Sequence, residues 1–171
     1  MDTWSTLKSR RQVRSFTDQQ IPDEILRRIL EGGRLAPSGN NRQPWDFVVI
    51  SDGDQKTRLS QSWQGAGFTA GAAIVIAVIV PVIDDERTAL MNRFDLGQAA
   101  LQLTLAATDL DVASGLASCR DQDLAREVLG LPVDRFVAIL VALGYPADRP
   151  LAPIMNLDRK PFDQVVHFDQ W

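Results

Sequence analysis

Apolar and polar residues alternate along the chain with two different spacings, which predict where helices and strands lie. Five aliphatic residues recur every three or four positions among charged ones: Ile21, Ile25, Leu26, Ile29 and Leu30. This is the pattern of a helix with one face on a core. Pro22 suits the first turn of this helix, and the pair Gly32-Gly33 predicts its end.

The longest apolar run, 71–83, is rich in Ile and Val. It is too short for the roughly 20 helical residues that cross a bilayer, so it predicts a fully buried strand over 72–80 and no membrane span. Three shorter runs predict further strands at 45–50, 112–118 and 136–143.

Four more helices are expected, at 2–11, 52–63, 87–110 and 122–129, the first with Asp2 or Thr3 as its N-cap. Within the third of these, the stretch 96–108 carries no charged residue. A helix that is apolar on every side must be covered on every side. Because the core of one small domain would struggle to cover it, a second subunit is expected to pack against it.

A length of 171 residues and an ordinary globular composition predict a single domain, 1–171. No repeat, linker or low-complexity tract divides it. The segment 146–171 is rich in Pro and contains Phe162, Phe168 and Trp171. Aromatic side chains on an irregular tail are expected to lie on another surface, that of a partner subunit.

A single Cys and a single His exclude several kinds of site. Structural zinc and iron–sulfur clusters each need four ligands, so no metal site is predicted. One cysteine forms no internal disulfide, which fits a reducing cytoplasm, and no export signal is expected at the N-terminus. The net charge of −4 and the pI near 4.9 disfavour nucleic acid as a partner.

Three clusters of polar residues are candidates for chemistry. The first, Arg10-Arg11-Gln12-Val13-Arg14, has three guanidinium groups that suit phosphate oxygens. On spacing alone, a solvated helix end is the simpler interpretation. The third, Arg159-Lys160, adds a cationic pair near the C-terminus, and a solvated tail explains it equally well.

The second cluster is the loop from Pro37 to Gln43, which leads directly into a predicted strand. Its amide and hydroxyl groups offer donors and acceptors that match the edge of a heterocycle. An ordinary turn is the alternative, since Asn and Gly are the commonest turn residues.

Two other groups are weaker candidates. Cys119 and His167 would make a thiolate–imidazole pair, with Asp163 or Asp169 to orient the imidazole, but Cys119 is more simply a small buried side chain. Asp84-Asp85-Glu86 is more simply a solvated turn than a cation site, because no further ligands follow it.

Five short sequence motifs favour the functional interpretation of all three clusters. They are SRRQVRSF at 9–16, APSGNNRQPW at 36–45, DLGQAA at 95–100, GYP at 144–146 and RKP at 159–161. In this order they resemble the FMN-dependent nitroreductase family. Each string is weak alone, but five in register cover nearly the whole chain.

The resemblance implies a three-layer α/β/α fold of the α+β class around a mostly antiparallel sheet. It also implies a domain-swapped homodimer with two FMN sites at the subunit interface. By position, Arg10 with Arg159 and Lys160 would hold the FMN phosphate, and Arg14 would lie near the flavin pyrimidine ring. The other implied cofactor contacts are Arg11, Gln12, Pro37, Ser38, Asn41, Gln43 and Ser118, with Cys119 beside Ser118.

The implied function is that of an oxidoreductase. NAD(P)H would reduce bound FMN and leave, and a nitroaromatic, quinone or activated alkene would then take the electrons in the same place. Arg14 would stabilise the reduced ring electrostatically, and no side-chain nucleophile, metal or catalytic His would be needed. Two alternatives stay open: a specialised reductase, for dehalogenation or flavin fragmentation, and a flavin-binding or regulatory module without turnover.

Some positions depart from the family's pattern. Gln12 stands where Ser is usual, so a hydroxyl contact to the phosphate would be lost or replaced by an amide. Only a short segment around 84–88 separates the Ile-rich strand from the long helix, which predicts an open pocket. Trp63, Gln64 and Phe68 are candidates for flanking the flavin.

Overall fold

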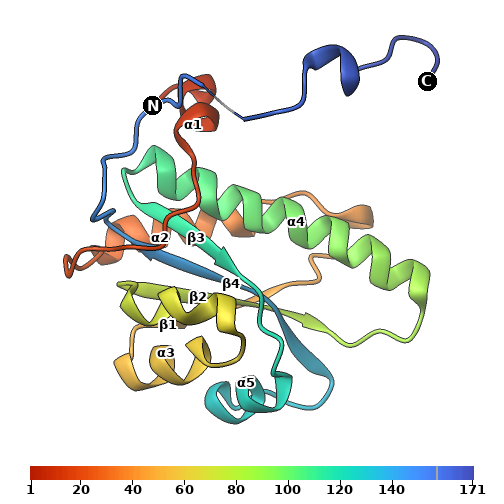
Figure 1. Cartoon of the computed structure of the whole chain (residues 1–171). Helices are drawn as coiled ribbons and strands as arrows, with labels where there is room; N and C mark the ends of the chain where they lie inside the picture. The colour runs from red at the N-terminus through yellow and green to blue at the C-terminus, as the bar shows by residue number, and fades with distance from the viewer. Residues whose placement is uncertain (157) are drawn as a thin grey trace.

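The computed structural model describes residues 1–156 and 158–171, with helices on both faces of one sheet (Figure 1). The strands are β1 (Asp46–Ile50), β2 (Ile74–Pro81), β3 (Ala113–Ala117) and β4 (Arg135–Gly144). The α-helices are α1 (Thr3–Ser9), α2 (Asp23–Arg34), α3 (Gly53–Ser60), α4 (Glu86–Asp109) and α5 (Gln122–Leu129). Three 3-10 helices are η1 (Gly39–Asn41), η2 (Gln64–Gly71) and η3 (Phe162–Gln164).

The strand order is β1-β2-β4-β3, and every neighbouring pair is antiparallel. Strands β2 and β4 are therefore central, whereas β1 and β3 form the two edges. The antiparallel sheet and the α+β class predicted from the sequence are confirmed.

Side chains of β2 alternate between two hydrophobic clusters, which explains why almost the whole strand is apolar. On one face Ile74, Ile76 and Val78 pack in the cluster that includes residues of α2 and α4. On the other face Val75, Ala77 and Ile79 pack in the cluster that includes residues of α3 and α5. The result is the three-layer arrangement that the resemblance implies (Figure 1).

The helix α2 continues through Gly32-Gly33 to Arg34, beyond the end predicted for it. A Cβ on Gly32 would lie 2.7 Å from Cβ of Ala106, and one on Gly33 would lie 2.7 Å from the side chain of Leu103. The two glycines thus allow α2 to approach α4 closely, and they do not end the helix.

Two other predicted helices are too long. The first ends at Ser9, after Asp2 has capped it by accepting from the backbone N–H groups of Trp4 and Ser5. The helix predicted over 52–63 ends at Ser60 as α3, and the 3-10 helix η2, which the sequence did not indicate, follows it. Residues 10–11 and 61–63 therefore lie outside these two helices, and both stretches adjoin the candidate site.

Helix α4, which contains the uncharged stretch 96–108, is covered on only one side by its own chain. Ala99, Leu103 and Ala107 are buried, but Leu90 and Phe94 are 63% and 64% exposed. The tail after β4 passes α1, where the Ile154 N–H donates to the Lys8 carbonyl, and then leaves the body of the molecule (Figure 1). An apolar helix face and an aromatic-rich tail are therefore both left without a covering surface within the described chain.

No helix within residues 1–156 and 158–171 is both long and apolar enough to cross a membrane. The same residues contain no group of three or more His, Cys, Asp or Glu side chains placed to hold a metal ion.

Candidate functional site

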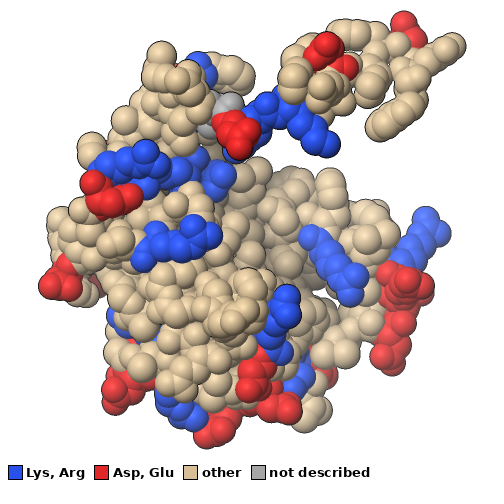
Figure 2. Space-filling model, viewed as in Figure 1, with Lys and Arg blue, Asp and Glu red and all other residues tan. Residues whose placement is uncertain are grey.

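The segment that follows α1 carries the first predicted cluster, and its burial alternates. Arg11 and Val13 are buried, whereas Arg10, Gln12 and Arg14 are partly or fully exposed. Alternation with period two is typical of extended backbone, in which Arg10 and Arg14 share one side and lie up to about 13 Å apart. Figure 2 shows basic side chains gathered around α1 and the segment that follows it.

The guanidinium of Arg11 is bonded within the chain. It donates to both carboxylate oxygens of Asp148, at 3.2 and 3.3 Å, and to the Arg149 carbonyl at 2.6 Å. The hydrogen bond from Arg11 lowers the pKa of Asp148. These three acceptors attach the tail to the segment after α1, and the cofactor contact predicted for Arg11 stays a prediction.

The amide of Gln12 is bonded to the backbone of Leu116. Its Nε2 donates to the Leu116 carbonyl at 2.8 Å, and its Oε1 accepts from the Leu116 N–H at 2.9 Å. The neighbouring Val13 N–H donates to the Ser114 carbonyl at 2.9 Å. Gln12 therefore attaches the arginine-bearing segment to the outer edge of β3. The cofactor contact predicted for Gln12 stays a prediction.

Replacing Gln12 by serine is expected to remove both bonds to Leu116 and to destabilise the protein by about 1–2 kcal/mol. For a chain of this size the melting temperature should fall by roughly 2–8 °C in thermal unfolding. Gln20→Ser is the matched control, because the amide of Gln20 is exposed and makes one local bond. Equal shifts in the two variants would contradict the attachment.

Within the segment after α1, the guanidinium of Arg14 lies over the ring of Phe68, and its Cζ is 5.8 Å from the ring centroid. The ring of Phe68 packs against Gly115 of β3, where a Cβ would lie 2.6 Å from the ring and 2.2 Å from the Val13 carbonyl oxygen. The structure thus brings Arg14 and η2 together at the edge of β3.

Further along the same edge, Ser118 is exposed just after β3, and Arg120 lies over the ring of Trp63 at 5.0 Å. Trp63 is half-buried and Gln64, which begins η2, is exposed. Sequence reasoning missed Arg120, because nothing in its spacing linked it to Trp63.

The loop from Pro37 to Gln43 has an unusual backbone. Asn40, Asn41 and Gln43 have φ of 53°, 55° and 50°, in the left-handed region that non-glycine residues rarely adopt. Local bonds hold the loop: Ser38 Oγ accepts from the Gln43 N–H at 2.9 Å, and Gln43 Nε2 donates to Asn41 Oδ1 at 3.1 Å. Strained backbone that is held firmly in place is found preferentially at functional sites.

Asp95 of α4 anchors the loop from Pro37 to Gln43. Its carboxylate, in a residue only 2% exposed, accepts from the Gly39 N–H at 3.1 Å. The Gln98 amide lies 3.5 Å from the other carboxylate oxygen. A buried carboxylate thus attaches the start of the loop to the long helix.

Replacing Asp95 by alanine is expected to free the loop, because the Gly39 N–H loses its acceptor at a cost of about 1–3 kcal/mol. Amide hydrogen exchange of peptides covering 36–45 should become faster, while peptides from β4 keep their protection. Asp95→Asn, which keeps an acceptor oxygen, should show a smaller effect. Unchanged exchange in Asp95→Ala would exclude the anchoring role.

The clusters of one chain lie at opposite edges of the sheet. The loop leads into β1, whereas Arg10 to Arg14 lie along the outer side of β3. The strands β1 and β3 are themselves about 14 Å apart, three strand spacings of about 4.8 Å. Arg159 and Lys160 are exposed on the projecting tail, where Arg159 donates to the Asp158 carbonyl at 2.6 Å. One chain therefore does not bring all the predicted residues together.

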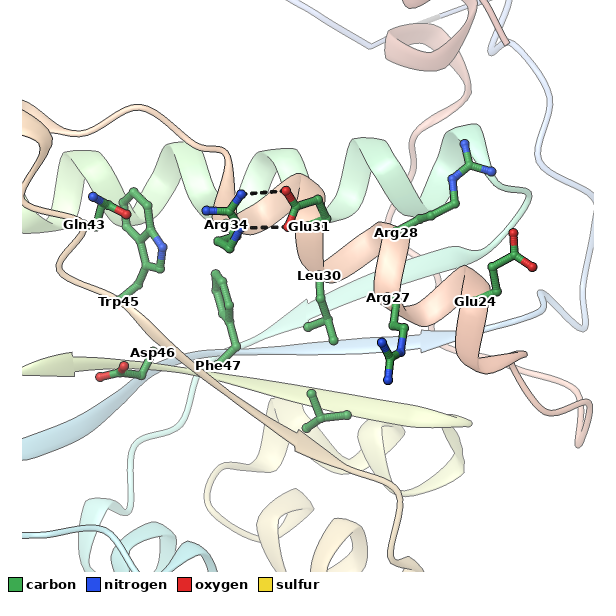
Figure 3. A pocket seen from close by; sticks show the side chains of 11 residues that line it. Glu24, Arg27, Arg28, Leu30, Glu31, Arg34, Gln43, Trp45, Asp46 and Phe47 are labelled. Carbon is green, nitrogen blue, oxygen red and sulfur yellow. Dashed lines mark hydrogen bonds and ion pairs between the residues drawn. The ribbon is translucent and has the colours of Figure 1, made fainter.

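A cavity of about 830 Å³ lies elsewhere, between α2 and the outer edge of β1. Figure 3 shows Arg34 paired with Glu31 near the rings of Trp45 and Phe47 in this groove. Of the predicted site residues only Gln43 lines it. The groove follows the side of β1 that has no neighbouring strand among the described residues.

The weaker candidates of the sequence are not assembled into sites. His167 packs on Trp171 in the tail, with ring centroids 4.6 Å apart, while Cys119 is buried beside the Asp121 carbonyl. Burial raises the pKa of the Cys119 thiol, so it stays protonated at neutral pH. Asp85 caps α4 by accepting from the Thr88 N–H at 2.8 Å.

Comparisons with known proteins agree with this architecture. A model of the nitroreductase family matches residues 7–66 and 60–145. A protein of Archaeoglobus fulgidus named for NADH dehydrogenase and NAD(P)H nitroreductase activity is 33% identical, over 95% of each chain. A structure of an FMN-dependent nitroreductase from Clostridium difficile has a TM-score of 0.85 and 26% identity, covering 99% of this chain and 100% of that one. Iodotyrosine deiodinase 1 of Pongo abelii is 24% identical, over 95% of this chain and 67% of the relative.

Proposed function

The chain belongs to the nitroreductase family of oxidoreductases, and from this premise we propose that it binds FMN and uses NAD(P)H to reduce it. The proposed acceptor is a nitroaromatic, a quinone or an activated alkene. The observation that carries the proposal is the placement of Arg10 and Arg14 on one side of the segment beside Phe68 and Gly115.

These residues fit an elongated ligand with a phosphate at one end and an aromatic ring at the other. Among the described residues, neither Arg10 nor Arg14 forms an ion pair with a carboxylate, so both guanidinium groups are available to a ligand. Their separation of up to about 13 Å suits two different parts of one molecule, not a single phosphate. Arg10 is assigned to the phosphate and Arg14 to the ring edge.

A second copy of the chain is proposed to supply the loop from Pro37 to Gln43. The exposed apolar face of α4, with Leu90, Phe94 and Leu101, provides the contact between copies. The tail 146–171 of each copy then extends over the other, which brings Arg159 and Lys160 toward the phosphate held by Arg10. The groove between α2 and β1 is the surface proposed to receive the end of that tail, because an unpaired strand edge readily accepts another segment.

When bound, FMN accepts hydride from NAD(P)H and delivers electrons to an acceptor that takes the same place. The chain binds and orients this cofactor and leaves one face accessible, since only residues 82–85 connect β2 to α4. Arg14 places a positive charge where negative charge develops on the reduced ring. Ser38, Asn41 and Gln43 offer polar groups to the ribityl chain and the ring edge.

Replacing Arg14 by alanine is expected to lower the two-electron reduction potential of the bound flavin by about 30–60 mV. This corresponds to the loss of one charge-assisted contact of about 1.5–3 kcal/mol. The potential is measured by anaerobic titration against a reference dye. Arg14→Lys, which keeps the charge, should shift the potential less, and equal potentials in all three proteins would remove Arg14 from this role.

Purified protein tests the function directly. We expect visible flavin absorbance that bleaches anaerobically on addition of NADH or NADPH and returns when a nitroaromatic or a quinone is added. Flavin that stays oxidised with both donors would indicate a binding module without turnover. Protein that stays colourless after incubation with FMN would contradict the proposal.

Reductive dehalogenation is the second candidate, favoured by the similarity to iodotyrosine deiodinase over 95% of this chain. Release of iodide from an iodophenol by the flavin-loaded, reduced protein would support it. Turnover of quinones without any release of halide would leave the general reductase as the function.

A further inference from the structure

A second cavity, of about 460 Å³, lies between the candidate flavin loop and the first turns of α4. Its lining comes from two elements and includes two arginines: Gly39, Asn40, Arg42, Arg87, Thr88, Met91 and Asp95. None of these residues was assigned to the flavin. The volume lies in the range of pockets that hold small organic ligands.

Arg42 and Arg87 are exposed cations from different parts of the chain that share this cavity. Within the part of the chain that the structure describes, neither forms an ion pair with a carboxylate. Both guanidinium groups are therefore available to bind an anion in the cavity, Arg42 from the loop and Arg87 from α4.

The acidic groups nearby are already engaged. The Asp95 carboxylate accepts from the Gly39 N–H, and the Asp85 carboxylate accepts from the Thr88 N–H. Asp95 is the one acidic residue of the lining, against two arginines. Just outside the lining, the hydrogen bonds from Thr88 and the charge of Arg42 lower the pKa of the Asp85 carboxyl. Asp84 and Glu86, next to Asp85 in sequence, do not line the cavity.

The geometry also fixes where a bound anion would lie. Arg42 stands between Asn41 and Gln43, which are proposed to contact the flavin edge, and the bond from Gly39 to Asp95 fixes the loop on α4. An anionic group bound in this cavity would therefore lie next to residues that are proposed to contact the flavin.

We propose that Arg42 and Arg87 bind an anionic group, carboxylate or phosphate, of a ligand that reacts at the flavin. The proposal rests on the proposed function and adds a substrate class to it: acceptors that carry a carboxylate, or NADPH in preference to NADH through its extra phosphate. The two guanidinium groups would supply affinity for the charge and leave the reacting part of the ligand on the ring.

The test compares two pairs of ligands that differ by one anionic group, using the flavin-loaded protein. The KM of para-nitrobenzoate is measured against that of para-nitrobenzamide, and the KM of NADPH against that of NADH. In Arg42→Gln and Arg87→Gln, at least one of the two KM ratios, para-nitrobenzoate to para-nitrobenzamide or NADPH to NADH, should rise about tenfold, the loss of one charge-assisted contact. A rise for the acceptor pair identifies a carboxylate site, and a rise for the donor pair identifies a phosphate site.

Arg93→Gln is the matched control, because Arg93 lies on the same helix but lines a different cavity, between α4 and the ends of β2 and β4. Unchanged ratios in both variants, or equal changes in Arg93→Gln, would overturn the inference while the proposed function stands.

If the protein showed no turnover, calorimetry would test the anion site independently of activity. It would compare the binding of para-nitrobenzoate with that of para-nitrobenzamide, and the binding of NADP+ with that of NAD+. Preferential binding of an anionic member that is lost in Arg42→Gln and Arg87→Gln supports the site. Equal binding of both members of each pair overturns it.

Discussion

Replacing Gly115 by alanine is expected to destabilise the protein by about 3 kcal/mol and to abolish stable binding of FMN. The new Cβ would lie 2.2 Å from the Val13 carbonyl oxygen, and backbone cannot rotate away as a side chain can. The segment after α1 must then move off β3, which strains the packing of Phe68 and weakens the bonds from Val13 and Gln12. Thermal unfolding should show a melting temperature lower by roughly 6–12 °C.

Gly53→Ala is the matched control, because a Cβ at Gly53 meets no atom within 4 Å. It should unfold within about 0.5 kcal/mol of the unchanged protein. If Gly115→Ala unfolds at the same temperature as Gly53→Ala and retains flavin, the close approach of Val13 to β3 does not shape the site. If Gly115→Ala unfolded like the unchanged protein but lost flavin, the substitution would act on the positions of Arg10 and Arg14 and not on the stability of the fold.

Replacing Arg10 by alanine is expected to weaken FMN binding about 10- to 150-fold with little change in folding. A charge-assisted bond to phosphate contributes about 1.5–3 kcal/mol, and Arg10 makes no ion pair within the described chain that its loss would break. The dissociation constant is measured by the quenching of flavin fluorescence on titration with apoprotein.

Arg58→Ala removes the same charge from α3, in the layer of helices across the sheet from α4, where Arg58 pairs with Glu127 at 2.7 Å. Its FMN affinity should equal that of the unchanged protein. The double replacement of Arg159 and Lys160 by alanine should resemble Arg10→Ala if the tail of one copy reaches the phosphate held by the other. If Arg10→Ala bound FMN as tightly as the unchanged protein, the assignment of Arg10 to the phosphate would be wrong.

Most of the fold could be read from the sequence because apolar periodicity decides which residues are buried. The strands and α4 were predicted within two residues at every boundary. The errors occurred where tertiary contact overrides local preference: glycines that usually end a helix instead let α2 pack on α4. The 3-10 helix η2 has no clear periodicity, so its sequence gave no signal.

The candidate site was only partly predictable, for a related reason. Arg10, Arg11 and Arg14 look equivalent in sequence, yet only the backbone direction separates the buried Arg11 from the other two. The partner of Arg11, Asp148, lies 137 positions away, and no local pattern points to it. Likewise, Arg42 and Arg87 share a cavity only because Asp95 attaches the loop to α4.

The two halves of the candidate site lie at opposite edges of one sheet, and this has a genetic consequence. If two copies share each site as proposed, a chain damaged in the loop 37–43 and a chain damaged at Arg10 can rescue each other. Their mixed pair would contain one site in which both halves are sound and another in which both are broken. Two inactive alleles would then yield partial activity, with each mixed pair restored to half its capacity.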